Sequence, residues 1–578
     1  MAKKKKPSEA TSRIKVVKDT VLGPYKSQFA EMREEFTTWR PYFYEIAQYF
    51  APRRGKYLNS PDSDVNARKH YTTREKILNG TTEDAARMIA AGMHGGMTSP
   101  SYPWFELALE DEELMKYGPV RMWLYTVRNI MLSIFSRSNF YESMYSQYFE
   151  LPVFGTAAMM MEEDFETVIR FRPYTIGEYY LAYDKNYRIT TMFRNFQMTA
   201  RMMLEKFGEE PLSESVIDAI NQSKPERRFE VVSAVQLNKH MDPSLEGRRG
   251  MEYESVYYEA SNNEDKLLAR GGYSTKPFAA PRWDVVGIDI YGDGLGAMAL
   301  GDAKMLQKEE EKKLKALDKS IDPPMNATSD LKKKGAGSFA GALNFMDVAQ
   351  GATGFSPSYQ INPDLEKIAY EIATVEQRIR RFFFNDLFLA ILNSDKNMTA
   401  TEVATKNEEK IQMLGPVINS LQQEQLDPVI TRTYVVAEER GMFPEAPFEL
   451  DGLPLKIKYV SKMARAQQMV GVEGIERNVG FIERLALLDP VKAISKLNTF
   501  EAIDEHAKLT AVVPTMITDS KIAAKQVAAQ QQKIDQAQQQ EQLGQAAEGA
   551  EKLSNAKTGE DDKSLLTDVM EQGAANQF

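Results

Sequence analysis

The residues that most often bind metals or act as nucleophiles are scarce and scattered in this sequence. Its 578 residues include no cysteine, which excludes thiol nucleophiles and cysteine-ligated zinc. Its four histidines, His70, His94, His240 and His506, lack the short spacing of metal ligands. Carboxylates are plentiful, yet no pair differs from the charged faces that solvated helices carry. We therefore expect no catalytic residue, no metal site and no cofactor, and we predict that the protein is not an enzyme.

The glycine-rich stretch Gly292-Asp293-Gly294-Leu295-Gly296 is the closest approach to a nucleotide-binding loop. It lacks the full G-x-G-x-x-G spacing, and the chain contains no G-x-x-x-x-G-K-S/T phosphate loop. A turn is the better interpretation of this stretch.

Two short basic clusters could contact phosphate groups. One is Lys332, Lys333 and Lys334, and the other is Arg378, Arg380 and Arg381. With 72 basic and 82 acidic residues the net charge is −10, so the chain as a whole has no basic footprint for nucleic acid. For both clusters, a solvated face or ion pairs between subunits is the first interpretation, and contact with phosphate is the second.

The arginine cluster lies on the most regular helical pattern of the chain. Asn362-Pro363-Asp364 is a helix start signal, and apolar residues then recur at spacings of three and four. This pattern predicts one long straight helix over residues 364–392.

A short polar segment at 393–398 separates this helix from a second helical run that should start at 399. The second run contains Gly415-Pro416 and Asp427-Pro428. Because a proline removes one backbone hydrogen bond from a helix, the run should bend. The polar residues of the intervening segment are Asn393, Ser394, Asp395, Lys396 and Asn397.

The remaining patterns predict an α+β, mainly helical protein with several structural units. Helices are expected over 20–50, 75–93, 119–151, 196–222 and 297–317, the last of them highly charged. Strands are expected at Val168–Arg172, at Tyr179–Thr191, within 228–290 including Val285–Ile290, and at Leu455–Val460. Residues 320–363 are rich in glycine, serine and lysine and form an excursion between two long helices.

Both ends of the chain are polar. The basic tip Met1–Lys6 is not followed by an apolar run, so we interpret it as a disordered solubilising tail rather than a signal peptide. Residues 518–550 are dominated by glutamine and alanine, which favours a long polar helix or one formed only on assembly; 553–578 are expected to be disordered. No apolar run approaches the ~20 residues of a membrane span, so no membrane association is expected.

An ordered series of short motifs resembles the portal (head-to-tail connecting) proteins of podovirus-type bacteriophages, over roughly residues 25–510. The motifs are Asp84-Ala85-Ala86, Gly95-Gly96-Met97-Thr98-Ser99-Pro100 with Trp104-Phe105, Asn139-Phe140-Tyr141, Val153-Phe154-Gly155-Thr156-Ala157, Pro281-Arg282-Trp283, Tyr291-Gly292-Asp293-Gly294, Ala299-Leu300-Gly301-Asp302-Ala303-Lys304, Asp322-Pro323-Pro324, Phe383 to Leu389, Met398-Thr399-Ala400-Thr401-Glu402-Val403, Leu414-Gly415-Pro416, Tyr459-Val460-Ser461 and Ala464-Arg465-Ala466-Gln467. One departure is Asp293-Gly294-Leu295, where the family pattern has Gly-Pro near the turn.

The resemblance implies a portal-type subunit with named parts. These are a flexible basic tail at 1–19, an α+β wing at 20–296, a first stem helix at 297–319, a clip at 320–363, a second stem helix at 364–392, a tunnel loop at 393–398, a kinked helix with the remainder of the wing at 399–510, and a glutamine- and alanine-rich helical crown with a disordered tail at 511–578. In such a subunit the loop residues Asn393, Ser394, Asp395, Lys396 and Asn397 face DNA, Arg378, Arg380 and Arg381 belong to the stem, and Lys332, Lys333 and Lys334 belong to the clip that contacts terminase and adaptor.

The resemblance also implies partners and a location. Subunits of this kind form a ring, expected to be a dodecamer, at one vertex of the capsid. Double-stranded DNA is packaged and ejected through the ring, which docks terminase and a tail adaptor or head-completion protein and contacts the major capsid and scaffolding proteins. The protein is then expected in the virion at the head–tail junction, after assembly in the host cytoplasm.

Two other classes of protein stay open from the residues alone. An internal core or scaffold protein of a capsid would suit the glutamine- and alanine-rich tail. A nucleic-acid hydrolase would need a convergent acidic or metal cluster, and the sequence shows none.

Overall fold

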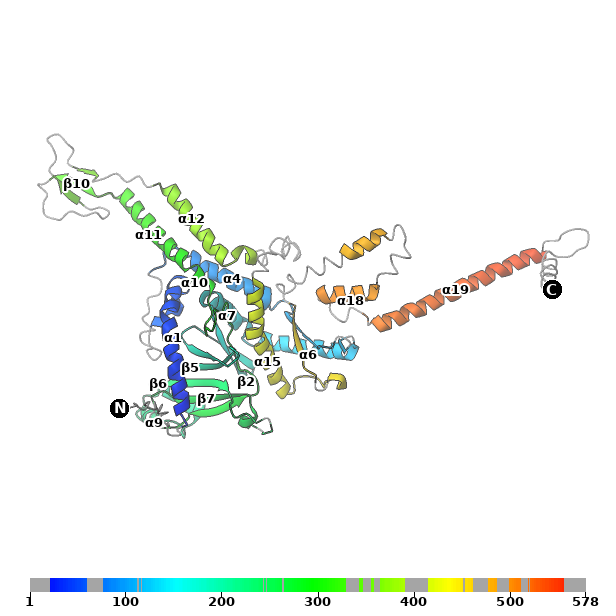
Figure 1. Ribbon diagram of the computed structural model, residues 1–578, viewed down its shortest axis with the longest axis horizontal. Helices are drawn as coiled ribbons and strands as arrows, with labels where there is room; N and C mark the ends of the chain where they lie inside the picture. Colours follow the sequence, from blue (N-terminus) through cyan, green and yellow to red (C-terminus); the bar gives the residue numbers. More distant parts are fainter. Residues whose placement is uncertain are drawn as a thin grey trace, which may run out of the picture. The chain divides into compact units, whose positions relative to one another are not determined.

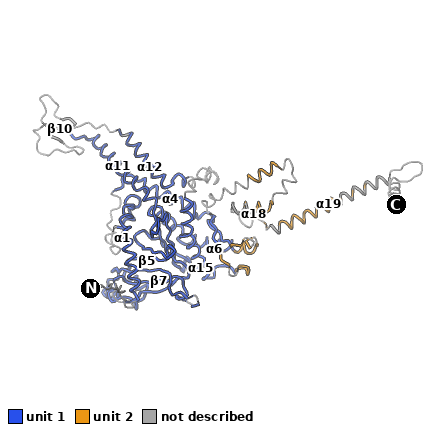
Figure 2. Tube along the Cα trace, viewed as in Figure 1, with its two compact units in different colours: residues 1–108, 124–445, 455–470 blue, residues 109–123, 446–454, 471–578 orange. Residues whose placement is uncertain are grey.

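The computed structural model describes most of the chain, and it divides into two compact units (Figure 2). The described residues are 21–59, 76–389, 414–450, 453–460, 477–485, 498–510, 518 and 520–555, with gaps at 112–113, 116, 243, 246, 262–264, 329–342, 347–354 and 358–363. The first unit comprises residues 1–108, 124–445 and 455–470, and the second comprises 109–123, 446–454 and 471–578. The predicted tail at 1–19 lies outside the described residues.

The larger sheet of the first unit has five antiparallel strands in the order β4-β5-β6-β7-β8. They are β4 (Tyr179–Tyr183), β5 (Ile189–Thr199), β6 (Arg228–Leu237), β7 (Tyr253–Glu259) and β8 (Ala269–Tyr273). β-branched and aromatic residues dominate these runs, as a pleated and half-buried surface favours. The strands predicted within 179–191 and 228–290 are therefore confirmed, except at Val285–Ile290.

Two smaller sheets of the body are also present among the described residues. β2 (Ala158–Asp164) lies between β3 (Val168–Tyr174) and β9 (Phe278–Ala279). β1 (Phe105–Ala108) pairs with β13 (Lys456–Tyr459), which confirms the strand predicted at Leu455–Val460. The sequence did not predict β1, because its four residues follow a proline-rich turn and are too few to show an alternating pattern.

The long helix α1 (Gly23–Phe50) packs on the larger sheet at β4 and β5 (Figure 1). The ring of Phe29 lies edge-on to Tyr180, with 5.3 Å between the ring centroids, and stacks on Phe193 at 6.0 Å. Phe36 is fully buried and also contacts Tyr180. The helix predicted over 20–50 is thus confirmed, with its apolar face held by aromatic contacts.

The helix predicted over 119–151 is two helices, α6 (Gly118–Arg137) and α7 (Phe140–Phe154). Asn139 separates them, and its side chain binds the outer edge of β3. Its amide nitrogen donates to the Phe171 carbonyl at 2.6 Å, and its amide oxygen accepts from the Phe171 N–H at 2.9 Å. The break occurs because this side chain satisfies backbone groups of an edge strand that has no further strand beside it among those described.

Two further predictions for the first unit are corrected. The helix expected over 196–222 begins only at α8 (Ala200–Phe207) and continues as α9 (Glu214–Asn221), since β5 runs to Thr199. The strand expected at Val285–Ile290 is a loop that turns at Gly287, where φ is +62°. β-branched composition alone suggested that strand, and no partner strand faces it among the described residues.

Backbone packs directly on backbone where the end of α7 meets residues 291–296. Gly155 ends α7 with φ +78°, and a Cβ there would overlap the Gly292 carbonyl. Gly292 and Gly294 would each overlap the Gly155 backbone if they carried a Cβ. Thr156 Oγ1 accepts from the Gly292 N–H at 2.7 Å. We call this contact, made by residues 152–157 and 291–296, the glycine junction. The glycine-rich stretch is not the turn that was predicted: Asp293 pairs with Asp284 as an isolated bridge, Leu295 and Gly296 begin a short helix, and the glycines permit close approach.

The described part of the second unit includes α18 (Thr499–Thr510) and α19 (Ser520–Asn555), both marked in Figure 1. α19 is a 36-residue helix, which confirms the long polar helix predicted over 518–550. Its side chains from residue 524 to residue 540 are all exposed, so no face of the helix is buried along this stretch. An isolated polar helix gains little free energy from burial. Such a helix is stabilised chiefly by its own backbone hydrogen bonds and by any chain that packs against it.

A pair of substitutions tests the glycine junction. Gly441 also has a left-handed conformation after a helix, with φ +63°, but a Cβ there meets nothing within 4 Å. We expect Gly441→Ala to lower the free energy of unfolding by about 1 kcal/mol, the cost of the left-handed conformation. Gly155→Ala should lower it by at least about 3 kcal/mol, because overlap with the Gly292 carbonyl adds to that cost. Chemical denaturation followed by near-UV circular dichroism measures both, and equal losses would contradict the close approach.

Candidate functional site

Two antiparallel helices of the first unit include the most regular helical pattern of the sequence. α11 (Leu300–Ile321) and α12 (Leu365–Phe382) lie side by side (Figure 1). A three-stranded sheet of β10 (Met325–Thr328), β11 (Leu343–Met346) and β12 (Phe355–Pro357) lies between them in the chain, with β10 in the centre. The stretch 320–363 is therefore an excursion that contains strands, and we call the two helices the helical hairpin.

An apolar seam and the ion pair between Arg378 and Asp302 hold the helical hairpin together. The buried residues of α12 include Ile372, Val375 and Ile379, at the three- and four-residue spacing seen in the sequence. Asp364 caps the start of α12 by accepting from the Lys367 N–H at 3.0 Å, so the predicted start signal is confirmed. On the outside of the seam, an Arg378 guanidinium nitrogen lies 3.0 Å from an Asp302 carboxylate oxygen of α11.

The three arginines that were predicted to belong to the stem differ in what they contact. Arg378 bridges α12 to α11 through Asp302, with one guanidinium nitrogen also 3.7 Å from the Met305 sulfur. Arg380 and Arg381 are exposed and form no ion pair with another described residue. Arg378 is therefore an element of hairpin stability, whereas the other two have guanidinium groups available at the surface.

Like charges also face each other across the helical hairpin. Glu309 of α11 lies opposite Glu371 of α12, and burial together with the Glu371 charge raises the pKa of Glu309. Further along α11, Lys308 and Lys315 both bind Glu311 and lower the pKa of that exposed carboxyl to about 2. Intrahelical pairs of this kind compensate most of the charge on α11.

Asn79 fixes the helical hairpin to the body. Its amide nitrogen donates to Glu310 of α11 at 3.1 Å and to Glu376 of α12 at 2.8 Å. Gln307, a buried residue of α11, accepts from the Asn79 N–H at 2.9 Å and donates to the Asn79 carbonyl at 2.9 Å. The Asn79 side-chain oxygen also accepts from Thr81 at the start of α4 (Thr81–Met97) at 3.0 Å. One residue therefore joins three helices.

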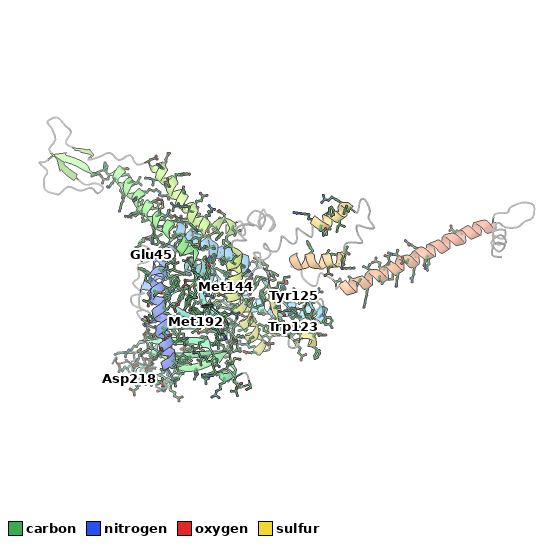
Figure 3. All side chains as sticks on the ribbon, in the orientation of Figure 1. Glu45, Trp123, Tyr125, Met144, Met192 and Asp218 are labelled. Atoms are coloured by element: carbon green, nitrogen blue, oxygen red, sulfur yellow. The ribbon has the colours of Figure 1, made fainter. Side chains whose placement is uncertain are left out.

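A second tie comes from α1. The Lys304 ammonium of α11 lies 2.5 Å from the carboxylate of Glu45, the residue labelled on α1 in Figure 3. No periodic pattern in the sequence pointed to Asn79, Gln307 or Glu45. The Asn79-Gly80-Thr81 turn before a helix was a usable signal for the first, since asparagine is favoured at helix starts.

The straight helix expected over 364–392 is shorter than predicted. α12 ends at Phe382, and Phe384 has a left-handed φ of +51° before residues 385–389 become helical again. Phe383 is fully buried against Phe50, with 5.5 Å between ring centroids, and Phe388 lies directly on Gly92, where a Cβ would overlap its ring. Burying both aromatic side chains against α1 and α4 requires the turn, so packing overrides the straight helix predicted over 364–392.

The second run is helical in its described part, as predicted, and its regular α-helical hydrogen bonding is interrupted just before the second proline. Residues 414–421 are helical, a π-helical segment spans Gln422–Leu426, and α15 covers Asp427–Glu439. Pro428 has no N–H to donate to the carbonyl four residues earlier, and the wider π turn accommodates this loss. The start of the run at 399 lies outside the described residues.

The π-helical segment contributes a carboxylate to the core. Glu424 accepts from the buried Arg282 through its guanidinium group at 2.6 Å and through its backbone N–H at 2.9 Å. Burial lowers the pKa of the nearby Lys276 to about 8, against the opposing effect of the Glu424 charge. The Pro281-Arg282-Trp283 motif therefore joins the π segment to the strand pairing beside the glycine junction.

Several predicted site residues lie outside the described residues. They are the clip lysines Lys332, Lys333 and Lys334 and the loop residues Asn393, Ser394, Asp395, Lys396 and Asn397. Within the described residues, no group of three or more histidine, aspartate or glutamate side chains could hold a metal ion. The same residues contain no helix long and apolar enough to span a membrane.

Apolar side chains remain exposed along the helical hairpin. On α11 these are Met305, Leu314, Leu317 and Ile321, with Ile321 exposed to 75%, and on α12 they include Tyr370, exposed to 72%. A soluble surface helix usually presents charged residues at such positions. Repeated apolar exposure on one structural element is typical of a surface that another chain covers.

Comparison with known proteins identifies the family. A model of the bacteriophage head to tail connecting protein family matches residues 23–517. This chain belongs to that family. A portal protein of Salmonella phage epsilon15 is 36% identical over 553 residues, with 95% of this chain and 98% of the relative covered. A probable portal protein of Bordetella phage BPP-1 is 35% identical over 547 residues, with 94% and 97% covered.

Membership of the head-to-tail connecting family decides between the interpretations left open by the sequence. The role is that of a portal protein, a structural component of the virion in an oligomeric assembly with capsid and tail partners. The alternative of an internal core or scaffold protein is thereby set aside. Among solved structures, a chain of the virion of a native gene transfer agent particle is 10% identical and covers 75% of this chain and 91% of its own, at a TM-score of 0.30, too weak a likeness to compare the folds.

Asn79 offers a test of how this connector family member holds its helical hairpin. Asn79→Asp keeps the oxygen that accepts from the Thr81 N–H but replaces the donor facing Glu310 and Glu376 with a third carboxylate. We expect the free energy of unfolding to fall by about 2 kcal/mol or more. The amide that donates to Glu310 and Glu376 is lost, and three carboxylates then repel one another. Hydrogen–deuterium exchange should accelerate in 300–321 and 365–382 and stay unchanged in β5–β7.

Asn186→Asp, in an exposed turn, is the control for adding one negative charge. It should leave exchange in the helical hairpin unchanged. Identical exchange in the Asn79→Asp protein and the unaltered protein would show that Asn79 does not hold the helical hairpin.

Proposed function

We propose that copies of this chain assemble into a ring, a dodecamer, in which the helical hairpins surround a channel for double-stranded DNA. The exposed apolar residues of α11 and α12 support this arrangement, since side-by-side packing in a ring would cover them. The predicted parts then have places: the wing is the body of the first unit, the stem is the helical hairpin, and the clip is the stretch between α11 and α12. The single observation that carries the proposal is the family match over residues 23–517.

The same proposal assigns the partners. The clip with Lys332, Lys333 and Lys334 would bind terminase during packaging and the tail adaptor or head-completion protein afterwards. The tunnel loop at 393–397 would face the DNA, and α19 would belong to the crown inside the capsid. The major capsid and scaffolding proteins would contact the wing, and the ring would assemble in the host cytoplasm before joining the virion. The near-complete coverage of phage relatives supports these assignments.

Charge balance along the helical hairpin supports a passive channel. α11 carries six basic and five acidic residues, and α12 carries four basic and three acidic residues. Each phosphate contact adds affinity and therefore friction, so a conduit should avoid a continuous basic surface. We propose that compensated charge lets DNA pass without being gripped.

Assembly of the ring is tested by imaging and mass measurement of the full-length protein. We expect negative-stain images of rings with a central hole, and a mass that is twelve times that of the 65.5 kDa chain. Leu314→Glu with Leu317→Glu should prevent rings while the subunit stays folded, since both positions are exposed. Leu204→Glu, at an exposed apolar position of α8, is the control and should assemble normally. A monomer under all conditions would refute the ring.

Charge reversal tests the passive channel. Glu366→Lys with Glu371→Lys adds lysines at exposed positions of α12, and Glu366→Gln with Glu371→Gln is the control for loss of the carboxylates. We expect rings of the lysine protein to bind duplex DNA about tenfold more tightly at low salt, because each lysine adds a phosphate contact. The corresponding phage should package more slowly or retain its genome on triggering. Normal packaging with a lysine-rich stem would defeat this idea.

A further inference from the structure

Residues 284–289 form an exposed loop of the first unit that is apolar at its tip and acidic at both ends. It turns at Gly287, and the side chains on either side of the turn reach into solvent. Val286 is exposed to 65% and Ile288 to 66%. Apolar side chains gathered at an exposed loop mark a surface that another chain covers. We call this segment the 284–289 loop.

The acidic side chains at the 284–289 loop have no cation to balance them. Asp284 and Asp289 are its first and last residues, and Glu35 of α1 lies near Asp289. Partial burial and the charge of Asp289 raise the pKa of Glu35. None of these three carboxylates forms an ion pair with another described residue. Cations of a second chain would therefore stabilise the loop.

A groove of about 930 Å³ elsewhere in the first unit has the opposite charge. Its cations are Lys56, Arg172, Arg194, Lys206 and Arg228, against the two acids Glu178 and Glu205. Arg172 and Arg194 form ion pairs inside the chain, whereas Lys206 and Arg228 are exposed and pair with no other described residue. We call this the basic groove.

The basic groove also offers apolar surface. Phe196 of β5 is half-buried in its lining, and Met202 of α8 is exposed to 47%. The Lys206 ammonium lies 4.2 Å from the ring centroid of Tyr257, which holds this cation beside the apolar side chains. The groove therefore suits a ligand that carries apolar and acidic side chains together, as the 284–289 loop does.

The larger sheet separates the basic groove from the 284–289 loop. Phe193 of β5 stacks on α1. Arg194 points to the opposite face, because successive residues of a strand alternate, and its guanidinium lies 4.3 Å from the Tyr174 ring. The loop is on the α1 side: Tyr291, two residues beyond it, lies 5.4 Å from Phe36 between ring centroids. The two surfaces therefore do not meet within one copy of the chain.

We propose that the 284–289 loop of one copy binds in the basic groove of the next copy around the ring. This contact depends on the proposed ring, because a ring built from heterologous contacts joins two different surfaces of the same chain. The apolar tip would pack on Met202, and the carboxylates would bind Lys206 and Arg228. Both surfaces belong to one chain and so occur in equal numbers, and closure of the ring covers all of them.

Crosslinking of the full-length protein tests which surfaces meet. The chain has no cysteine, so engineered thiols react without background. Ile288→Cys with Met202→Cys, treated with a short bis-maleimide, should give a ladder of multimers on a denaturing gel. An equimolar mixture of the two single variants should give dimers only. Ile288→Cys with Leu204→Cys is the matched control, since Leu204 is an exposed residue of α8 outside the groove, and it should give at least tenfold less multimer.

Charge reversal and rescue test the electrostatic part of the contact. Lys206→Glu with Arg228→Glu should raise at least tenfold the protein concentration at which half of the chains are in rings, as measured by analytical ultracentrifugation. Glu35→Lys with Asp289→Lys should have the same effect. All four changes in one chain restore opposite charges and should return assembly to within about threefold of the unaltered protein.

Lys224→Glu with Lys239→Glu reverses two exposed lysines outside the basic groove and should leave assembly unchanged. Rings that give no crosslinked ladder, or no rescue by the four changes, would overturn this contact and leave the portal role intact. Duplex DNA that blocks the crosslink would reassign the groove to nucleic acid. A ladder without closed rings would uphold the contact and defeat the proposed ring, and neither rings nor a ladder would defeat both.

Discussion

Direct backbone packing at the glycine junction is the constraint on which the first unit depends. Gly155, Gly292 and Gly294 let the end of α7 lie against the segment that leads into α10 (Leu295–Met298) and α11, at a distance that no side chain could occupy. Only the absence of a Cβ permits this approach. The path of α11 away from the body is therefore set by three glycines. The neighbouring side-chain contacts form around that path.

Polar side chains add hydrogen bonds and ion pairs to the segments that meet at the glycine junction and to α11. Tyr42 of α1 donates to Asp293, and burial together with that carboxylate raises the pKa of the tyrosine. Asp293 also accepts from the Gly294 N–H at 3.0 Å, so the departure from the family pattern at these residues has a structural use. Asn79 binds Glu310 of α11, and Glu45 binds Lys304 of the same helix. These are charge-assisted or buried hydrogen bonds, which lose most when one partner is removed.

Polar hydrogen bonds and ion pairs of this kind suit a structural component of a virion that must keep its shape within an oligomeric assembly. Burial of apolar side chains in the core stabilises the first unit. Met159, Met160 and Met161 of β2 are buried, and Met144 and Met192 lie inside the body (Figure 3). Hydrophobic burial is not directional, however, so it cannot by itself set the angle between the helical hairpin and the body. The hydrogen bonds at Asn79 and the backbone contacts at Gly155 do so.

Sequence periodicity determined the elements that depend on local pattern. The amphipathic stripe of α12, its Asp364 cap, the alternating strands β3 to β7 and the polar helix α19 were all predictable, because side chains within a few residues decide them. The motif series also identified the family. Tertiary structure alone decided where elements stop: Phe383 and Phe388 end the straight course of α12 to reach α1 and α4, Asn139 divides α6 from α7 to bind β3, and Glu424 turns toward Arg282. Each choice depends on a partner more than 30 residues away in the chain, and a local pattern contains no information about that partner.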